Sequence, residues 1–163
     1  LEFAFPDTKG RIISLSDKEF DNKIVIVQIM GTWCPNCLDE SKFLVNYLKE
    51  NPNKKIKIIA LAFENAKTRI AAYQRINRLK DRVAIDYPVL LAQFGKMADK
   101  KLAQQKLPML NHIISYPTTI FLDQDKKVRK IHTGFNGPAT GYKYEEFKKE
   151  FEEFIDELQN EKE

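Results

Sequence analysis

The sequence predicts an α/β fold in which helices flank a central mixed β-sheet. Two nearly continuous apolar runs, KIVIVQIM at 23–30 and KIKIIALAF at 55–63, are typical of parallel strands that are covered on both faces. A segment with helical spacing follows each run, and strands that alternate with helices indicate parallel pairing. Farther along, TTIFLD at 118–123 and KVRKIHTG at 127–134 flank a turn, which predicts an antiparallel hairpin that extends the sheet.

Length and composition bound the class of protein. With 163 residues, 43% of them hydrophobic, the chain suits one domain over residues 1–163 with an ordinary core. The net charge of +4 is small and the basic residues are spread out, so nucleic acid is not an expected partner. No apolar run approaches the roughly 18 residues of a membrane helix, so we expect membrane attachment only through a segment outside this chain. Because the chain starts at Leu1, we expect a part of a longer anchored or exported protein.

The remaining elements follow from local patterns. Residues 1–17 read as two short strands around a turn, and a helix from about Pro35 to Lys49 follows the first buried strand. The last helix, from about Tyr142 to Leu158, has an apolar stripe at spacings of three and four residues and is expected to dock on the sheet. Between them we expect a helix over 66–80 with Ile70, Tyr73, Ile76 and Leu79 near one face, a short strand over 87–92, a helix over 95–106 and a loop from Gly134 to Gly141.

The segment GTWCPNC at 31–37 contains both cysteines of the chain, separated by two residues. It follows a buried strand and opens a helix, where free N–H groups and the helix dipole stabilise a thiolate on Cys34. Cys37 lies one helical turn later, so the two sulfur atoms can form a disulfide. We therefore expect Cys34 to be the exposed, attacking thiol and Cys37 to face the core and resolve the mixed disulfide.

A metal site and idle thiols are the alternative interpretations of this cysteine pair. Zinc needs four ligands, or three ligands and a water molecule. Only His112 and His132 could join the cysteines, and their spacing is unlike that of a zinc finger. The sequence therefore favours redox chemistry, with no metal and no cofactor other than the Cys34–Cys37 disulfide.

WCPNC after a buried strand, with SYPTTIFLD about 80 residues downstream, resembles the thioredoxin superfamily. The N-terminal FAFPDTKGRIISLSD, the GTWCPNC motif and extra elements at about 64–110 resemble its TlpA/ResA branch more narrowly, whose thioredoxin-like domains are related to AhpC/TSA proteins. The resemblance covers nearly the whole chain. It implies a thioredoxin fold with an N-terminal β-hairpin and a βα insertion between the CxxC helix and a cis-proline strand.

The resemblance also implies which residues meet the substrate. Pro117 is expected to be cis and to lie against the CxxC motif, so that the backbone of Tyr116 faces an extended peptide. The implied substrate-binding residues are Trp33, Pro35, Tyr116, Pro117 and Thr118.

One position departs from the family pattern. Thioredoxin has a buried aspartate six residues before the first cysteine, where this chain has Gln28. Because glutamine cannot accept the proton of Cys37, another base is needed. Glu64 directly follows the second buried strand, which ends at the same sheet edge as Cys34, so we expect Glu64 to accept or relay this proton. Asp39 and Glu40 are expected only to favour the helix N-terminus electrostatically.

The sequence thus predicts a thiol–disulfide oxidoreductase that acts as a reductase of protein disulfides through Cys34-Pro35-Asn36-Cys37. The expected partners are protein disulfide or dithiol substrates and an upstream electron donor. By the family resemblance, we expect a bacterial, extracytoplasmic or periplasmic monomer. The identity of the substrate and the redox potential stay open.

Two other classes of protein fit the sequence less well. A peroxiredoxin-like peroxidase would have the motif Pro-x-x-x-Thr-x-x-Cys, but Thr32 lies two residues before Cys34 and position 27 is Val27. A non-catalytic thioredoxin-like binding domain would not need an intact cysteine pair together with Trp33 and Pro117. Both alternatives are therefore disfavoured.

Overall fold

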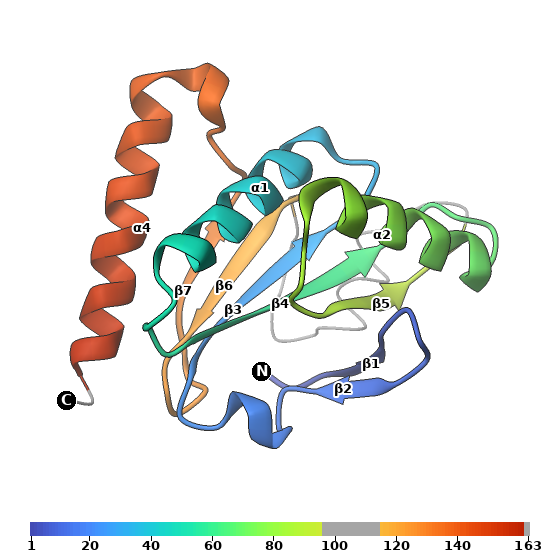
Figure 1. Cartoon of the computed structure of the whole chain (residues 1–163), viewed down its shortest axis with the longest axis horizontal. Coiled ribbons are helices and arrows are strands. Elements are labelled where there is room, and N and C mark those ends of the chain that lie inside the picture. Colours follow the sequence, from blue (N-terminus) through green and yellow to red (C-terminus); the bar gives the residue numbers. More distant parts are fainter. Residues whose placement is uncertain (96–114, 162–163) are drawn as a thin grey trace.

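The structure is a computed structural model that describes residues 1–95 and 115–161 (Figure 1). The helix predicted over 95–106 lies outside the described residues except for residue 95, and His112 also lies outside them. The described part contains a five-stranded sheet, a separate two-stranded hairpin and helices packed on the larger sheet.

Five strands form the central sheet in the order β5-β4-β3-β6-β7. The strands are β3 (Ile24–Met30), β4 (Ile56–Phe63), β5 (Val89–Gln93), β6 (Thr118–Leu122) and β7 (Val128–Thr133). The strands β3, β4 and β5 run parallel, whereas β6 is antiparallel to both β3 and β7. This mixed sheet confirms the predicted combination of parallel strands with an antiparallel hairpin.

The register brings the ends of three strands to one edge of the sheet. Ile29 of β3 pairs with Thr118 of β6, and Met30 pairs with Ala62 of β4. Because parallel strands end at the same edge, the segments that follow β3 and β4 lie next to the segment that precedes β6.

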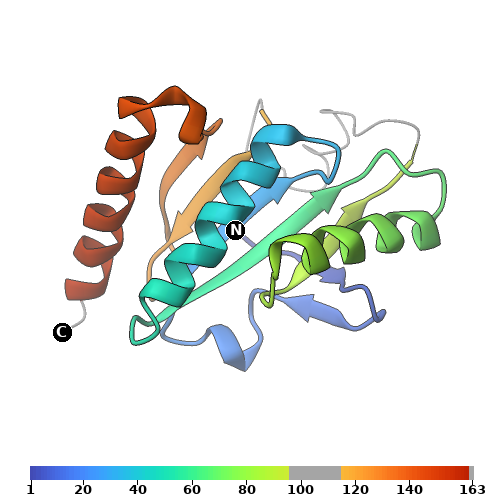
Figure 2. The same cartoon turned by 45° about the horizontal axis from the view of Figure 1, so that its top comes forward.

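Different elements cover the two faces of the sheet. The helices α1 (Pro35–Glu50), α2 (Arg69–Val83) and α4 (Tyr142–Asn160) contribute to one core (Figures 1 and 2). The opposite face is covered by the hairpin of β1 (Ala4–Pro6) and β2 (Ile12–Ser14) and by the short 3-10 helix η1 (Lys18–Phe20). All seven residues of β3 are buried because both faces are covered, as its continuous apolar run predicts.

The helix α2 begins later than its apolar spacing predicts, because Thr68 caps it. The hydroxyl of Thr68 accepts the backbone N–H of Ala71 at 3.1 Å. This start places Ile70 in the first turn, where it is 70% exposed, instead of on the predicted apolar face. The residues that α2 buries are Ala72, Ile76, Leu79 and Val83.

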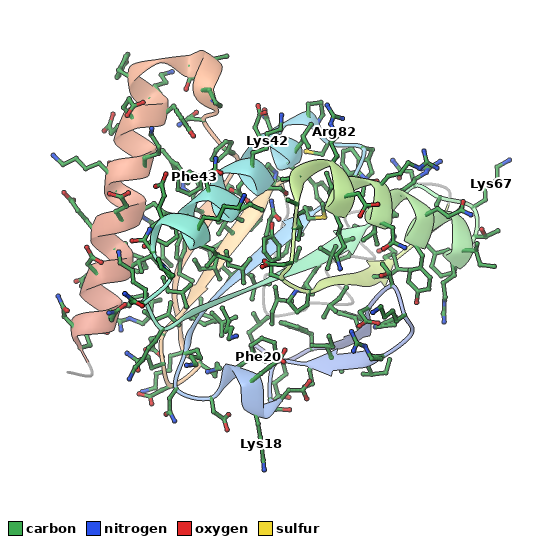
Figure 3. The ribbon with its side chains drawn as sticks, viewed as in Figure 1. Lys18, Phe20, Lys42, Phe43, Lys67 and Arg82 are labelled. Carbon is green, nitrogen blue, oxygen red and sulfur yellow. The ribbon has the colours of Figure 1, made fainter. Side chains whose placement is uncertain are left out.

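Aromatic side chains attach α4 to the rest of the core. The predicted loop over 134–141 contains a short 3-10 turn, η3 (Pro138–Thr140), that leads into α4. Phe151 of α4 lies edge-on against Phe43 of α1, with 4.9 Å between the ring centroids, and Figure 3 shows Phe43 between these two helices. Across the described ranges, none of the helices, α4 included, has the length and apolar character needed to cross a membrane.

Candidate active site around Cys34 and Cys37

Cys34 occupies the N-cap position of α1, shortly after β3 ends. Its backbone is extended, and its sulfur accepts the backbone N–H of Cys37 at 3.2 Å. Pro35 follows as the first helical residue, where the missing N–H would have no partner within the helix. Both cysteines are free thiols, so the structure represents the reduced dithiol.

Cys34 is less exposed than the sequence predicts. It is only 6% exposed, and Cys37 is fully buried. The Cys34 side chain turns back over the first turn of α1 to reach the Cys37 N–H, so it does not project into solvent, whereas Pro35 and Asn36 do. The expected order of accessibility holds, but the attacking thiol is almost covered.

The two thiols differ in acidity. Hydrogen bonds from the Cys37 thiol and from the backbone N–H groups of Cys37 and Asn36 lower the pKa of Cys34 to about 7, against the opposing effect of burial. The pKa of Cys37 is raised because its thiol donates to Cys34, because it is buried and because a Cys34 thiolate lies beside it. At neutral pH about half of Cys34 is therefore thiolate while Cys37 keeps its proton.

A buried carboxyl group lies beneath the start of α1. Glu40 follows Cys37 by one helical turn and is only 1% exposed, so the expectation that it merely favours the helix N-terminus is wrong. Thr119 of β6 donates its hydroxyl to both carboxylate oxygens of Glu40 at 3.0 Å. Burial raises the pKa of Glu40 to about 8, although hydrogen bonds from Thr119 and Gln28 act in the opposite direction.

Gln28 fills the position at which the resemblance implies a buried aspartate. Its amide nitrogen donates to the Cys37 carbonyl and to the Ser41 hydroxyl, both at 3.4 Å. Ser41 in turn donates to the Cys37 carbonyl at 2.9 Å. Gln28 and Thr119 pair directly across β3 and β6, so both side chains reach the underside of α1. The buried acid of this site is thus Glu40 on α1, and the amide of Gln28 occupies the position on β3 where the resemblance implies an aspartate.

Glu64 lies at the predicted sheet edge, where its carboxylate binds Thr32. One carboxylate oxygen accepts the Thr32 backbone N–H at 2.8 Å, and the other accepts the Thr32 hydroxyl. Burial raises the pKa of Glu64, while the bonds from Thr32 and the charge of Arg75 oppose this rise. Glu64 therefore holds the loop that leads to the CxxC motif, and Glu40 is the carboxyl whose charge acts on Cys37.

Trp33 forms an exposed rim beside Cys34. Its indole N–H donates to the carbonyl of Phe63 at 2.8 Å, and its ring lies edge-on to Tyr116 with centroids 5.0 Å apart. The backbone of Gly31 runs directly against the indole. An added Cβ at Gly31 would lie 2.2 Å from Trp33 Nε1 and 2.9 Å from the Phe63 carbonyl oxygen. The orientation of Trp33 therefore requires glycine at position 31.

The loop before β6 contacts this rim through Tyr116. The Tyr116–Pro117 peptide bond is cis, as the resemblance implies. Pro117 is buried, and its carbonyl accepts the N–H of Gly134 at 2.7 Å. Thr118 is also buried, and its hydroxyl donates to the carbonyl of Ser115 within the same loop. The contact between Tyr116 and Trp33 thus places the loop next to the cysteines.

Glu40 is the site residue that the sequence pattern did not reveal, although two signals pointed to it. Glu40 and Ser41 lie three and four residues after Cys37, Leu44 lies four and three residues after them, and all four residues are buried. A glutamate inside such a buried stripe, together with the missing acid at Gln28, indicates a buried carboxyl. In the parts of the chain that the structure describes, no three His, Cys, Asp or Glu side chains form a cluster suited to a metal ion.

Comparisons with known proteins agree with this geometry. A family model described as the AhpC/TSA family matches residues 1–131. The chain is 26% identical over 133 residues to the thioredoxin-like protein YneN of Bacillus subtilis, covering 82% of this chain and 68% of YneN. It is also 26% identical over 132 residues to the thiol-disulfide oxidoreductase ResA of Bacillus subtilis, covering 81% of this chain and 64% of ResA. The chain therefore spans about two thirds of the length of these relatives.

Solved structures share the fold. A thiol:disulfide interchange protein of the thioredoxin family from Chlorobium tepidum has a TM-score of 0.64 and 21% identity, covering 85% of this chain and 87% of that protein. The mixed sheet, the N-terminal hairpin and this likeness confirm the predicted thioredoxin fold. Because the family model spans most of its residues, the chain belongs to the AhpC/TSA family of thioredoxin-like proteins.

Proposed function

We propose that the chain, a thiol–disulfide oxidoreductase, works as a reductase of disulfide bonds in proteins. The observation that carries this proposal is the position of Cys34 at the helix N-terminus with a pKa of about 7. A thiolate that forms at neutral pH is the species that attacks a disulfide sulfur. The relative named ResA is itself described as a thiol-disulfide oxidoreductase, which supports the same chemistry here.

The reaction moves two electrons from the protein dithiol to the substrate disulfide. Cys34 Sγ attacks one substrate sulfur, forms a mixed disulfide and releases the other substrate sulfur as a thiolate, which takes up a proton. Cys37 then loses its proton and attacks Cys34 Sγ, which releases the first substrate sulfur and leaves the Cys34–Cys37 disulfide. A dithiol donor must reduce this disulfide before the next cycle.

The second step needs a base, since Cys37 is fully buried and its pKa is raised. Glu40 lies one helical turn away with a pKa of about 8, in the range where a carboxyl group can both take up and return a proton near neutral pH. In the reduced protein, the negative charge of the Cys34 thiolate helps to raise the pKa values of Cys37 and Glu40. This charge is absent once Cys34 is part of the mixed disulfide. Glu40 is therefore our candidate proton acceptor, and Glu64 is the alternative that the sequence suggests.

The extent to which the protein stabilises the Cys34 thiolate supports the reducing direction. A strongly oxidising enzyme such as DsbA lowers the pKa of its attacking cysteine to about 3.5, which stabilises the reduced form, whereas thioredoxin keeps its own near 7. The pKa of about 7 for Cys34 is that of the reducing type. We further propose, from the family resemblance, an extracytoplasmic monomer that uses a separate electron donor and no cofactor beyond its own disulfide.

The test measures both activity and redox potential. Reduced protein should cleave the disulfides of insulin, Cys34→Ser should abolish this activity, and Cys37→Ser should stop at a mixed disulfide on Cys34. Equilibration with glutathione should give a potential nearer to about −270 mV than to about −120 mV. A potential near the upper value would overturn the reducing direction. Failure of dithiothreitol and oxidised glutathione to interconvert the two forms would favour the binding-domain alternative, and peroxide consumption would favour the peroxidase.

A further inference from the structure

A groove opens beside the CxxC motif, between the start of α1 and the exposed side of α2. It has a volume of about 590 Å³. Thr32, Trp33 and Leu38 line one side, and Arg75, Arg78 and Arg82 line the other. Figure 3 shows Arg82 close to the start of α1. The groove therefore joins the immediate surroundings of Cys34 to a row of positive charges.

The three arginines lie on one face of α2. Their spacing of three and four residues brings the side chains together, and all three are exposed. The adjoining face of α2, with Ile76, Leu79 and Val83, is buried in the core, so the position of the helix is fixed and its arginines lie beside the buried face. The row is thus a fixed feature of the groove wall.

Asp81 lies beside Arg82 on the same helix, but it does not line the groove and forms no salt bridge with the row. Within 1–95 and 115–161, no carboxylate forms a salt bridge with Arg75, Arg78 or Arg82. The charge of Arg75 acts on Glu64, but both oxygens of that carboxylate are bound to Thr32. None of the residues that line the groove is acidic. The guanidinium groups are therefore available to a partner.

We propose that this groove binds acidic side chains that lie next to the reactive disulfide of a protein substrate. The proposal rests on the proposed reductase function. Trp33 directly precedes Cys34 and Leu38 follows it by one turn, so a substrate joined to Cys34 through a mixed disulfide must pass the rim of the groove. Aspartate or glutamate residues a few positions from the substrate cysteine then reach the arginines, whose planar groups pair with carboxylates through two hydrogen bonds.

The test compares matched disulfide peptides that differ only beside the cysteine. One peptide has Asp and Glu at the flanking positions, and the other has Asn and Gln. Reduction is followed through the fluorescence of Trp33, the single tryptophan of the chain, and by chromatography of the peptide. At about 0.01 M salt the acidic peptide should react about tenfold faster. At about 1 M salt the ratio should approach one, a measurement that needs no variant.

Two triple variants locate the effect. In Arg75→Gln/Arg78→Gln/Arg82→Gln, the ratio of the two rates at low salt should fall to near one. The control Lys18→Gln/Lys49→Gln/Lys57→Gln removes the same charge from exposed positions at the far end of the sheet and of α1, and it should keep the tenfold ratio. Equal rates for the two peptides in the wild type would overturn the proposal, and so would an equal loss of preference in both variants. In either case, reduction of the peptides would still uphold the reductase function. If neither peptide is reduced, both proposals fail.

Discussion

The hydroxyl of Thr119 donates to both carboxylate oxygens of Glu40, each at 3.0 Å, in a region that solvent does not reach. This contact joins β6 to α1 directly below the two cysteines. It also fixes the carboxyl group one helical turn from Cys37, the thiol that must lose its proton in the second half of the reaction. The protonation state of Glu40 therefore affects both the chemistry and the stability of the protein.

Substitution of Glu40 by glutamine should slow the release of the substrate from the mixed disulfide. Glutamine preserves the shape and the bond from Thr119 but cannot accept the Cys37 proton, so we expect a loss of about 100-fold in this step near neutral pH. Rapid quenching with acid, followed by mass spectrometry, measures the mixed disulfide as it accumulates. The initial attack by Cys34 should change much less, because that thiolate forms without Glu40.

Glu64→Gln is the matched comparison for this experiment. Glu64 binds Thr32 rather than a cysteine, so the variant should release the substrate at nearly the wild-type rate. The reverse pattern, with slow release in Glu64→Gln and normal release in Glu40→Gln, would assign the proton to Glu64 as the sequence suggests.

The buried Glu40 should make the folded protein less stable as the pH rises. Its pKa is about 8 in the folded state against 4.5 for an unperturbed glutamate, so the folded state binds more protons between these values. The free energy of unfolding should therefore fall from about pH 4.5 to about pH 8, by at most about 5 kcal/mol. Urea unfolding of the disulfide form, in which the cysteines do not titrate, measures this slope. In Glu40→Gln the slope should become clearly smaller, and the part that remains comes from Glu64, whose pKa is also raised by burial. An unchanged slope would mean that Glu40 titrates normally.

Removal of the Cys37 thiol should make Cys34 less acidic. The hydrogen bond from that thiol is the largest of the effects that bring the Cys34 pKa to about 7 from 9.0. In Cys37→Ala the backbone N–H groups stay in place, so the pKa should settle between these two values. The pH dependence of alkylation by iodoacetamide, or of thiolate absorbance, gives both midpoints. An unchanged midpoint would show that the helix N-terminus alone sets the acidity of Cys34.

Gly31→Ala should displace the Trp33 ring and weaken the fold. The added Cβ would overlap the indole nitrogen and approach the Phe63 carbonyl, at a cost of about 1–3 kcal/mol. Tryptophan emission and urea unfolding report the two effects. In a Trp33→Phe background the same alanine should cost less, because the indole nitrogen is absent. An equal cost in both backgrounds would place the strain elsewhere.

The sequence was sufficient for the elements whose pattern is local. The apolar runs of β3 and β4 and the proline at the start of α1 identified these elements to within a residue or two. Three features depend instead on how α1 sits on the sheet: the burial of Glu40, the covered Cys34 thiol and the contact between Glu64 and Thr32. The same holds for the arginine row of α2, since its spacing is visible in the sequence but the groove beside Trp33 is not.

The AhpC/TSA family model ends at residue 131, but the core of the protein does not. The rings of Phe135, Phe147 and Phe151 surround Phe43 on the helix that carries both cysteines, and all three lie beyond that boundary. The segment that matches the family model is thus shorter than the segment that must fold together. A protein cut at the family boundary would leave Phe43 open to water and deprive the redox helix of the support that holds it on the sheet.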